Sequence, residues 1–179
     1  MRYFKKIPGE RLYLSPMHPD DAELHAKWMN DPEVIRFLGG AHMQFSLARI
    51  RAWFDADTQK PDNHEFVIVL REGNRPIGHI HFENIHPVNR TATFGMHIGE
   101  AEDRSKGYGA EALKLLVDYG FKWLGLRNIA LEVNAENAGA IRCYEKAGFR
   151  QYGCRSGSAL YDGRWVDEVL MEILAEDWL

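Results

Sequence analysis

The chain has 179 residues, of which 45% are hydrophobic and 27% charged, a composition that suits one globular domain with its own core. Its formal net charge of -4 disfavours a general binder of nucleic acid or of membrane surfaces, although a local basic site for an anionic ligand stays open. Two cysteines, Cys143 and Cys154, are too few for a disulfide framework, and the longest compact apolar run, Phe66–Leu70, has only strand length, so we expect free thiols and a cytoplasmic protein without a membrane span.

The first third of the chain carries helix-start signals. Acidic residues follow Pro19, and Asp31 stands directly before Pro32, so a helix is expected to begin at each proline. A third segment repeats apolar side chains at helical spacing behind Ser46, another candidate cap. We therefore expect a short strand over residues 11–14, helices over 18–30, 31–38 and 46–56, and a loop over 58–63.

The rest of the chain alternates strand patterns with helix patterns. Residues 64–85 predict two strands around the turn EGNRP, and residues 91–99 predict a third strand, which together form an antiparallel meander. Apolar residues then recur at helical spacing from Leu113 onward. We expect helices over 107–125 and 137–148, and strands over 128–133, 149–157 and 164–174, the last behind a turn at Asp162 and Gly163. This order predicts one α+β domain over residues 1–179, with a mixed sheet covered by helices on both faces.

The stretch DRSKGYGAEA, residues 103–112, places two cations and two glycines at the start of the expected long helix. The first turn of a helix presents unpaired N–H groups and a partial positive charge, which favour a phosphate group, and glycine lets that group approach the backbone closely. Lys106 precedes the glycines, and Ala112 stands where a third glycine would be needed, so the two familiar nucleotide-binding loops do not fit. A flexible turn with two solvated cations is the alternative.

A second motif, Asn137–Phe149, follows the fifth expected strand. The motif Arg104–Gly109 and this second motif, in their order and at their interval, resemble the GCN5-related N-acetyltransferase (GNAT) family. Within it, the stretches HPVNRTATF and DGRWVDEVLME are similar to the branch that holds ribosomal-protein N-terminal acetyltransferases and spermidine N-acetyltransferase. The resemblance implies a mostly antiparallel, seven-stranded sheet flanked by helices, in which the fourth strand splays from the fifth and leaves a cleft for acetyl-CoA.

The resemblance also implies which residues hold acetyl-CoA, the expected acetyl donor. The main chain of Met96–Ile98 would bind the pantetheine arm and the acetyl carbonyl, and the backbone of the loop would wrap the pyrophosphate. The stretch before Arg104 is one residue longer than the commonest family spacing, so we expect a bulge at the loop entrance. The full set of implied cofactor contacts is Met96, His97, Ile98, Arg104, Ser105, Lys106, Gly107, Tyr108, Gly109, Asn137, Tyr144 and Lys146.

Tyr144 is the residue that the resemblance places at the reacting sulfur. Attack of an amine on a thioester expels a thiolate, whose pKa as a free thiol is about 8.5. A phenol with a pKa of about 10 can give that thiolate a proton as general acid. The alternative is that Tyr144 only packs its ring on a helix face.

The general base is harder to assign. A primary amine with a pKa of about 10.4 must lose a proton before it attacks, and the resemblance expects a glutamate where this chain has Thr93. Glu83 and His97 are the substitutes we name, with His81 beside them and a water chain ending on backbone carbonyls as alternatives. His79 and His81 alternate on one strand without an identifiable third ligand, so we expect no metal.

The acceptor is expected to be a small-molecule amine, polyamine-like or other. Asn84 and Thr93 stand where polyamine enzymes are expected to carry acids, which weakens a spermidine assignment. Two alternatives stay open: a protein N-terminal acetyltransferase like those of ribosomal proteins, and a non-catalytic regulatory module that binds acyl-CoA. The family resemblance leaves a homodimer through the terminal hairpin open as well.

Overall fold

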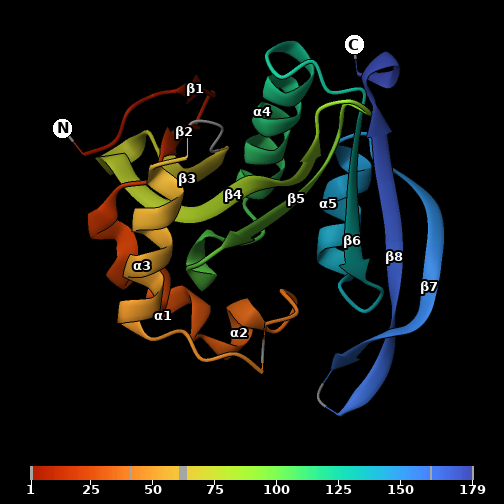
Figure 1. The fold of residues 1–179 in the computed structure, drawn as a ribbon, viewed down its shortest axis with the longest axis horizontal. Coiled ribbons are helices and arrows are strands. Elements are labelled where there is room, and N and C mark those ends of the chain that lie inside the picture. Colours follow the sequence, from red (N-terminus) through yellow and green to blue (C-terminus); the bar gives the residue numbers. More distant parts are fainter. Residues whose placement is uncertain (1, 41, 61–63, 162, 179) are drawn as a thin grey trace.

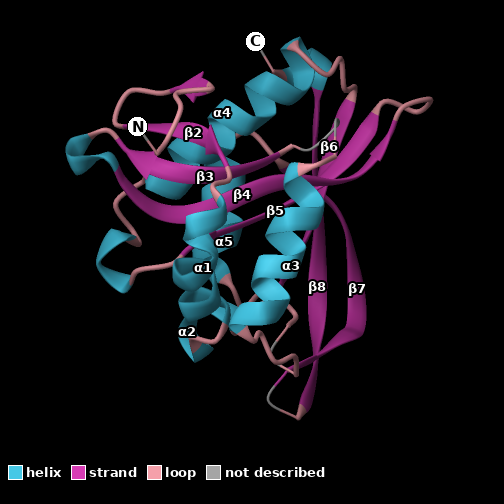
Figure 2. Ribbon diagram, turned by 60° about the vertical axis from the view of Figure 1, so that its left-hand side comes forward, coloured by secondary structure: helices cyan, strands magenta, loops and turns pink. Residues whose placement is uncertain are grey.

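The computed structural model describes residues 2–40, 42–60, 64–161 and 163–178. In this part of the chain an eight-stranded mixed sheet has the order β1-β2-β3-β4-β5-β6-β8-β7, with helices on both faces (Figures 1 and 2). The strands are β1 (Ile7–Pro8), β2 (Leu12–Pro16), β3 (Glu65–Leu70), β4 (Arg75–His86), β5 (Thr91–Ile98), β6 (Asn128–Asn134), β7 (Arg150–Tyr161) and β8 (Arg164–Leu174). The helices are α1 (Ala22–Met29), α2 (Pro32–Ile35), α3 (Leu47–Thr58), α4 (Tyr108–Lys122) and α5 (Ala138–Lys146).

The sheet confirms the predicted class and adds one strand to the predicted seven. The extra strand is β1, which pairs with Tyr13 and Leu14 of β2. A strand of two residues shows no alternation in the sequence, so only its pairing reveals it. All recorded strand pairs are antiparallel except β5 with β6, and these two are the fourth and fifth strands of the sequence-based numbering.

The N-terminal helices begin at or near the predicted signals. Helices α1 and α2 are shorter than the predicted 18–30 and 31–38, whereas α3 runs to Thr58, past the predicted end at residue 56. A 3-10 turn at Pro19–Asp21 precedes α1, and the Asp31 side chain accepts a hydrogen bond of 2.9 Å from the Glu33 N–H at the start of α2. The Ser46 hydroxyl accepts from the Arg49 N–H over 3.2 Å before α3. The predicted loop over 58–63 overlaps the end of α3, and its last three positions lie outside the described residues, as does Asp162 of the predicted hairpin turn.

The long helix α4 lies on one face of the sheet, and α1 and α3 lie on the other (Figure 1). The predicted stripe of α4 is buried, with Leu113, Leu116 and Val117 all fully shielded from solvent. Strand β4 alternates between the two faces, so Ile80 and Phe82 join the α4 core while His79 and His81 face the other side. None of the helices described here has the length and apolar character needed to cross a membrane.

Candidate functional site

Strands β5 and β6 separate part of the way along their length. Thr91–Thr93 pair with Asn128–Ala130 in parallel, and no β5–β6 pair is recorded in the described residues beyond this point (Figure 1). Backbone N–H and C=O groups along a separated strand edge require water or a ligand as partner. The predicted splay is therefore confirmed, and it begins at Phe94 and Leu131.

The glycine loop ends in a helix start that no side chain caps. Gly107 is the N-cap residue of α4 and has φ 81°, a left-handed conformation that glycine adopts without strain. Ser105 in the same loop has φ 60°, which is uncommon outside glycine. Because no side chain occupies the cap, the first N–H groups of α4 are open to an anion, as the sequence predicts.

Gly109 lets the first turn of α4 lie close to the sheet. A Cβ at this position would lie 3.3 Å from the Met96 Cε atom and 4.0 Å from the Ile98 Cγ1 atom. The first turn of α4 therefore packs closely on the separated part of β5. This contact brings the loop and the expected main-chain ligands of β5 to the same place.

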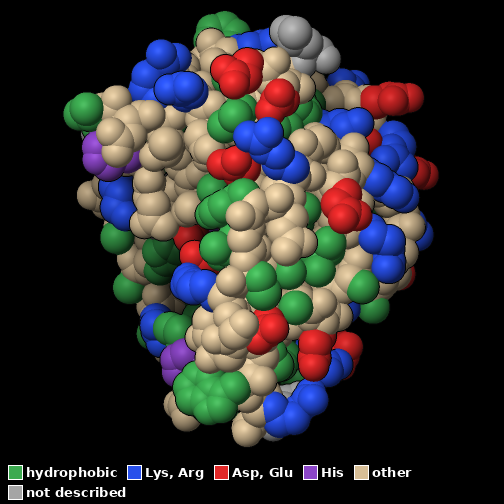
Figure 3. Space-filling model, turned by 90° about the vertical axis from the view of Figure 1, so that its right-hand side faces the viewer, with side chains coloured by type: hydrophobic (Ala, Val, Ile, Leu, Met, Phe, Trp, Pro, Cys, Tyr) green, Lys and Arg blue, Asp and Glu red, His purple; other side chains and the backbone are tan. Residues whose placement is uncertain are grey.

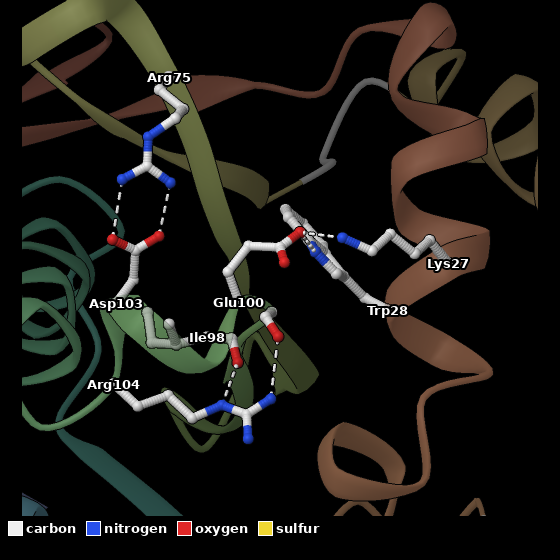
Figure 4. A network of polar contacts seen from close by, with 8 residues as sticks. Lys27, Trp28, Arg75, Ile98, Glu100, Asp103 and Arg104 are labelled. Carbon is white, nitrogen blue, oxygen red and sulfur yellow. Dashed lines mark hydrogen bonds and ion pairs between the residues drawn. The ribbon is translucent and has the colours of Figure 1, made fainter.

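The entrance to the loop is clamped by charged groups (Figure 4). The Arg75 guanidinium donates two hydrogen bonds, of 2.6 and 2.8 Å, to the Asp103 carboxylate, which is only 1% exposed. This bond to Arg75 lowers the pKa of Asp103. The Arg104 side chain turns back and donates to the carbonyls of Ile98 at 3.2 Å and Gly99 at 2.9 Å. A 3-10 turn at Ala101–Asp103 precedes Arg104 at the place where the bulge is expected.

Arg11 is a loop contact that the sequence did not reveal. Its guanidinium donates to the Lys106 carbonyl over 2.9 Å and to the Glu111 carboxylate over 2.8 Å, and it lies 4.9 Å from the centre of the Tyr108 ring. Because Arg11 directly precedes β2, these contacts hold the loop against the start of that strand. Arg11 and Lys106 are 95 positions apart, so no local motif could have connected them.

Helix α5 places Tyr144 at the point where the strands separate. The Tyr144 ring meets Phe94, the first β5 residue beyond the paired segment, at 5.7 Å between ring centres in an edge-on contact, and it meets Phe149 at 6.2 Å. Burial raises the pKa of the Tyr144 phenol above its usual value of 10.0. The phenol is therefore protonated at neutral pH, as a proton donor must be, and its ring also packs in the core.

The other predicted residues of α5 lie at its two ends. Asn137 is the N-cap residue, and its side-chain oxygen accepts a hydrogen bond of 3.1 Å from the Ala140 N–H. Lys146 is exposed in the last turn. The Asn137 oxygen therefore has a structural partner in the first turn of α5.

A carboxylate and an imidazole lie over Gly95 on the opposite face of the sheet. The Nε2 atom of His81 is 2.6 Å from the Oε1 atom of Glu83. A Cβ at position 95 would lie 2.7 Å from the His81 ring and 3.3 Å from the Glu83 carboxylate, so only glycine leaves room for this pair. The bond to His81 lowers the pKa of Glu83, whose side chain is 51% exposed.

The position where the resemblance expects a glutamate carries a neutral pair. The Asn84 amide donates to the Thr93 hydroxyl over 3.0 Å, and this hydroxyl donates to the Glu83 carbonyl over 3.3 Å. Neither group can take a proton from an ammonium at neutral pH. The nearest carboxylate along this strand pair is Glu83 itself, which the register places opposite Thr93.

The His97 side chain lies in a cluster of histidine and tryptophan rings. Its ring lies 5.4 Å from the His25 ring, 5.9 Å from the His79 ring and 5.8 Å from Trp28. Burial lowers the pKa of all three histidines, that of His25 from 6.5 to about 4. Among the described residues, no group of His, Cys, Asp and Glu side chains has an arrangement that could hold a metal ion.

Comparisons with known proteins agree with this geometry. A sequence model of the acetyltransferase (GNAT) domain matches residues 11–150. The uncharacterized N-acetyltransferase YnaD of Bacillus subtilis is 32% identical over 179 residues, covering 96% of this chain and 98% of that protein. The spermidine N(1)-acetyltransferase of Vibrio cholerae is 31% identical over 119 residues, covering 66% of this chain and 68% of that protein. The solved structure of a Vibrio cholerae spermidine N-acetyltransferase in complex with CoA and spermine has a TM-score of 0.87 and 23% identity, covering 94% of this chain and 98% of that one.

Proposed function

The chain belongs to the GNAT acetyltransferase family and is an N-acetyltransferase with acetyl-CoA as its donor, and we propose that it acetylates a small-molecule primary amine by direct attack within a ternary complex. One observation carries the proposal. At one end of the separated edge of β5, the start of α4 is open to an anion. On the other face of the sheet, the His81–Glu83 pair lies over Gly95 of the same strand. A cofactor site and a proton acceptor thus flank the same stretch of strand.

The chain's own backbone would hold the donor. The N–H groups from Ser105 to Gly109 and of the first turn of α4 would bind an anion such as a pyrophosphate, whereas the Arg104 N–H donates to the Ala101 carbonyl over 3.1 Å. The main chain of Met96–Ile98 would bind the pantetheine arm. Arg104 and Arg11 act on the loop itself, because their guanidinium groups are bonded to protein carbonyls. Bound acetyl-CoA supplies the thioester that the amine attacks.

The Glu83 carboxylate is the proton acceptor in this proposal. The hydrogen bond to His81 keeps the Glu83 carboxylate ionised and fixes its orientation, and it also makes the carboxylate a weaker base. About half of the Glu83 side chain is exposed, so the carboxylate can pass the proton on to water. The acceptor ammonium gives its proton to Glu83, directly or through one water, and the free amine attacks the thioester carbonyl. His97 contributes its main chain, because its imidazole is enclosed by His25 and Trp28.

Tyr144 completes the transfer. Collapse of the tetrahedral intermediate breaks the carbon–sulfur bond, and the electron pair of that bond leaves on the sulfur. The attacking nitrogen releases its extra proton to water, which leaves the neutral amide. The Tyr144 hydroxyl gives its proton to this thiolate and is reprotonated from solvent. The place of the Tyr144 ring beside Phe94, where the strands separate, supports this role, while burial raises the pKa of the phenol and so lowers its acidity.

The charges beside Glu83 favour one class of acceptor. The curated Vibrio cholerae relative is named for spermidine, yet Asn84 and Thr93 form a neutral pair beside Glu83 in this chain. A polyamine carries several positive charges and requires several carboxylates around it. A single carboxylate fits an acceptor with one ammonium group better, which favours a monoamine over spermidine.

Calorimetric titration with acetyl-CoA tests the donor site, and a well-folded protein that fails to bind acetyl-CoA would contradict the proposal. Gly107→Val should weaken this binding by at least about 10-fold, because a β-branched side chain cannot adopt the left-handed φ without strain. Gly73→Val is the matched control, since Gly73 has φ 67° with open space around it in the β3–β4 turn. The control should bind acetyl-CoA like the wild-type protein.

A thiol-release assay over a panel of amines, polyamines and peptides tests turnover and the acceptor class. Tyr144→Phe and Glu83→Gln should each lower kcat by roughly 100- to 10,000-fold while acetyl-CoA still binds. Full kcat in Tyr144→Phe at every pH would remove the general-acid assignment. Binding without turnover on any acceptor would favour a regulatory acyl-CoA-binding module instead.

A further inference from the structure

The terminal hairpin extends past the sheet beside the open end of the split. Strand β8 pairs with β6 only as far as Glu168, which lies opposite Asn134 at the end of β6. The hairpin itself continues to Tyr161 and Arg164, which pair with each other. Its outer part therefore stands beyond β6, on the side where β5 and β6 have separated.

One face of this outer part is covered, although the sheet does not reach it. Leu160 and Trp165 form a cross-strand pair on the outward face and are 61% and 69% exposed. Apolar side chains lie among charged ones on the side of the molecule that carries the hairpin (Figure 3). Tyr161 and Val166, on the other face, are only 6% exposed. A hairpin end without a neighbouring strand is open on both faces unless another element packs on it.

The segment after α2 supplies that cover. The Phe37 ring stacks on the Tyr161 ring at 5.7 Å between centres, with 20° between the planes. The Arg36 guanidinium lies 5.3 Å from the centre of the Phe37 ring. Asn30 fastens the base of the segment, because its amide donates to the carbonyls of Ala26 at 2.8 Å and Phe45 at 2.7 Å.

This stack joins the two sides of the split. The segment with Phe37 follows helices that are attached to β5 and the turn after it. Trp28 of α1 packs on His97, and its indole N–H donates to Glu100 over 3.0 Å, as Figure 4 shows for the second contact. Tyr161 is attached to β6 through β8. The contact between Phe37 and Tyr161 therefore spans the open end of the split on the face that carries Glu83.

We propose that the Phe37–Tyr161 stack is a size filter that admits a compact amine to Glu83 and excludes an acceptor that continues as a polypeptide chain. The filter rests on the proposed function and deepens it, because it decides between a small-molecule acceptor and a protein N-terminus. A polypeptide would have to lie across the open end, where two stacked rings are anchored from both sides. A compact monoamine needs no such passage.

The test compares Phe37→Ala and Tyr161→Ala with wild type, and Trp165→Ala, on the uncovered face of the same hairpin, is the matched control. For each protein, kcat/KM is measured for small monoamines and for the N-terminus of a short peptide. Removing either ring should raise the ratio of peptide to small-amine kcat/KM by at least about 10-fold, the size of effect that filling or emptying a pocket produces. Trp165→Ala should leave this ratio unchanged. Phe37→Leu keeps an apolar side chain, so its ratio of peptide to small-amine kcat/KM should lie between those of wild type and Phe37→Ala. It also provides a variant if Phe37→Ala unfolds.

A second measurement separates the filter from turnover. CoA is joined through an acetyl linker either to a small amine or to a short peptide, and the Kd of each conjugate is determined by calorimetry. The wild-type protein should bind the small-amine conjugate at least about 10-fold more tightly, and Phe37→Ala should remove most of that difference. If wild type bound both conjugates equally, the filter alone would be wrong. If it bound neither conjugate nor acetyl-CoA, the filter and the proposed function would fall together.

Discussion

The buried histidine cluster predicts that the fold loses stability in mild acid. His25 is 3% exposed, its ring lies 5.0 Å from the Trp53 ring and 5.4 Å from the Phe54 ring, and burial lowers its pKa from 6.5 to about 4. Between these two pH values the unfolded chain binds a proton at His25 and the folded chain does not. Stability contributed by the neutral imidazole is therefore complete above about pH 6.5 and is lost progressively as the pH falls below it.

The magnitude follows from the His25 shift. At pH 5 the unfolded histidine is almost fully protonated, and the resulting loss of folding free energy is about 2 kcal/mol, rising to about 3.4 kcal/mol well below pH 4. His79 and His97 act in the same direction, because burial also lowers their pKa. Total stabilities of about 5–15 kcal/mol make such losses large.

Urea unfolding followed by circular dichroism at about pH 7.5 and about pH 5, at constant ionic strength, measures this effect. His25→Phe keeps an aromatic ring in the cluster but cannot titrate, so its free energy of unfolding should fall by about 2 kcal/mol less than that of wild type over this pH range. The comparison uses the pH dependence of each protein, so a constant packing cost of the new ring does not affect it. His42→Gln, at an exposed position, is the control and should behave like wild type. Equal pH dependence in wild type and His25→Phe would refute the reasoning.

Three further changes test the site and the core. Asp103→Asn removes the charge that Arg75 grips at the loop entrance, and calorimetry should show acetyl-CoA binding weakened by roughly 10-fold, since a hydrogen bond to a charged group contributes about 1.5–3 kcal/mol. Gly95→Ala puts a methyl group 2.7 Å from the His81 ring and should lower kcat by at least about 100-fold while acetyl-CoA still binds. An unchanged kcat would mean that the His81–Glu83 pair takes no part in catalysis. Leu116→Ala, at a fully buried position of α4, should lower the free energy of unfolding by about 2–5 kcal/mol, and a loss well under this range in urea unfolding would mean that the core around it collapses to fill the space.

Local patterns determined most of the elements and the donor side of the site. The apolar stripe of α4, the alternation of β4 and the proline and aspartate signals of α1 and α2 depend on residues close together in the chain, and these elements form where the sequence predicts them. The same holds for the left-handed Gly107 at the start of α4, because a helix start and its glycine are neighbours in sequence. The motif Asn137–Phe149 added the family, which the comparisons confirm.

Contacts between elements far apart in the chain were decided only by tertiary structure. Phe37 stacks on Tyr161, and the His81–Glu83 pair occupies the space that Gly95 leaves on a neighbouring strand; on the donor side, Arg11 reaches Lys106. Each of these contacts joins residues from different elements, and the free energy of a contact depends on a register and a packing that no single segment specifies. The sequence by itself therefore determined the elements and the donor of the acetyl group, whereas the fold decided which residues of distant elements meet around the split between β5 and β6.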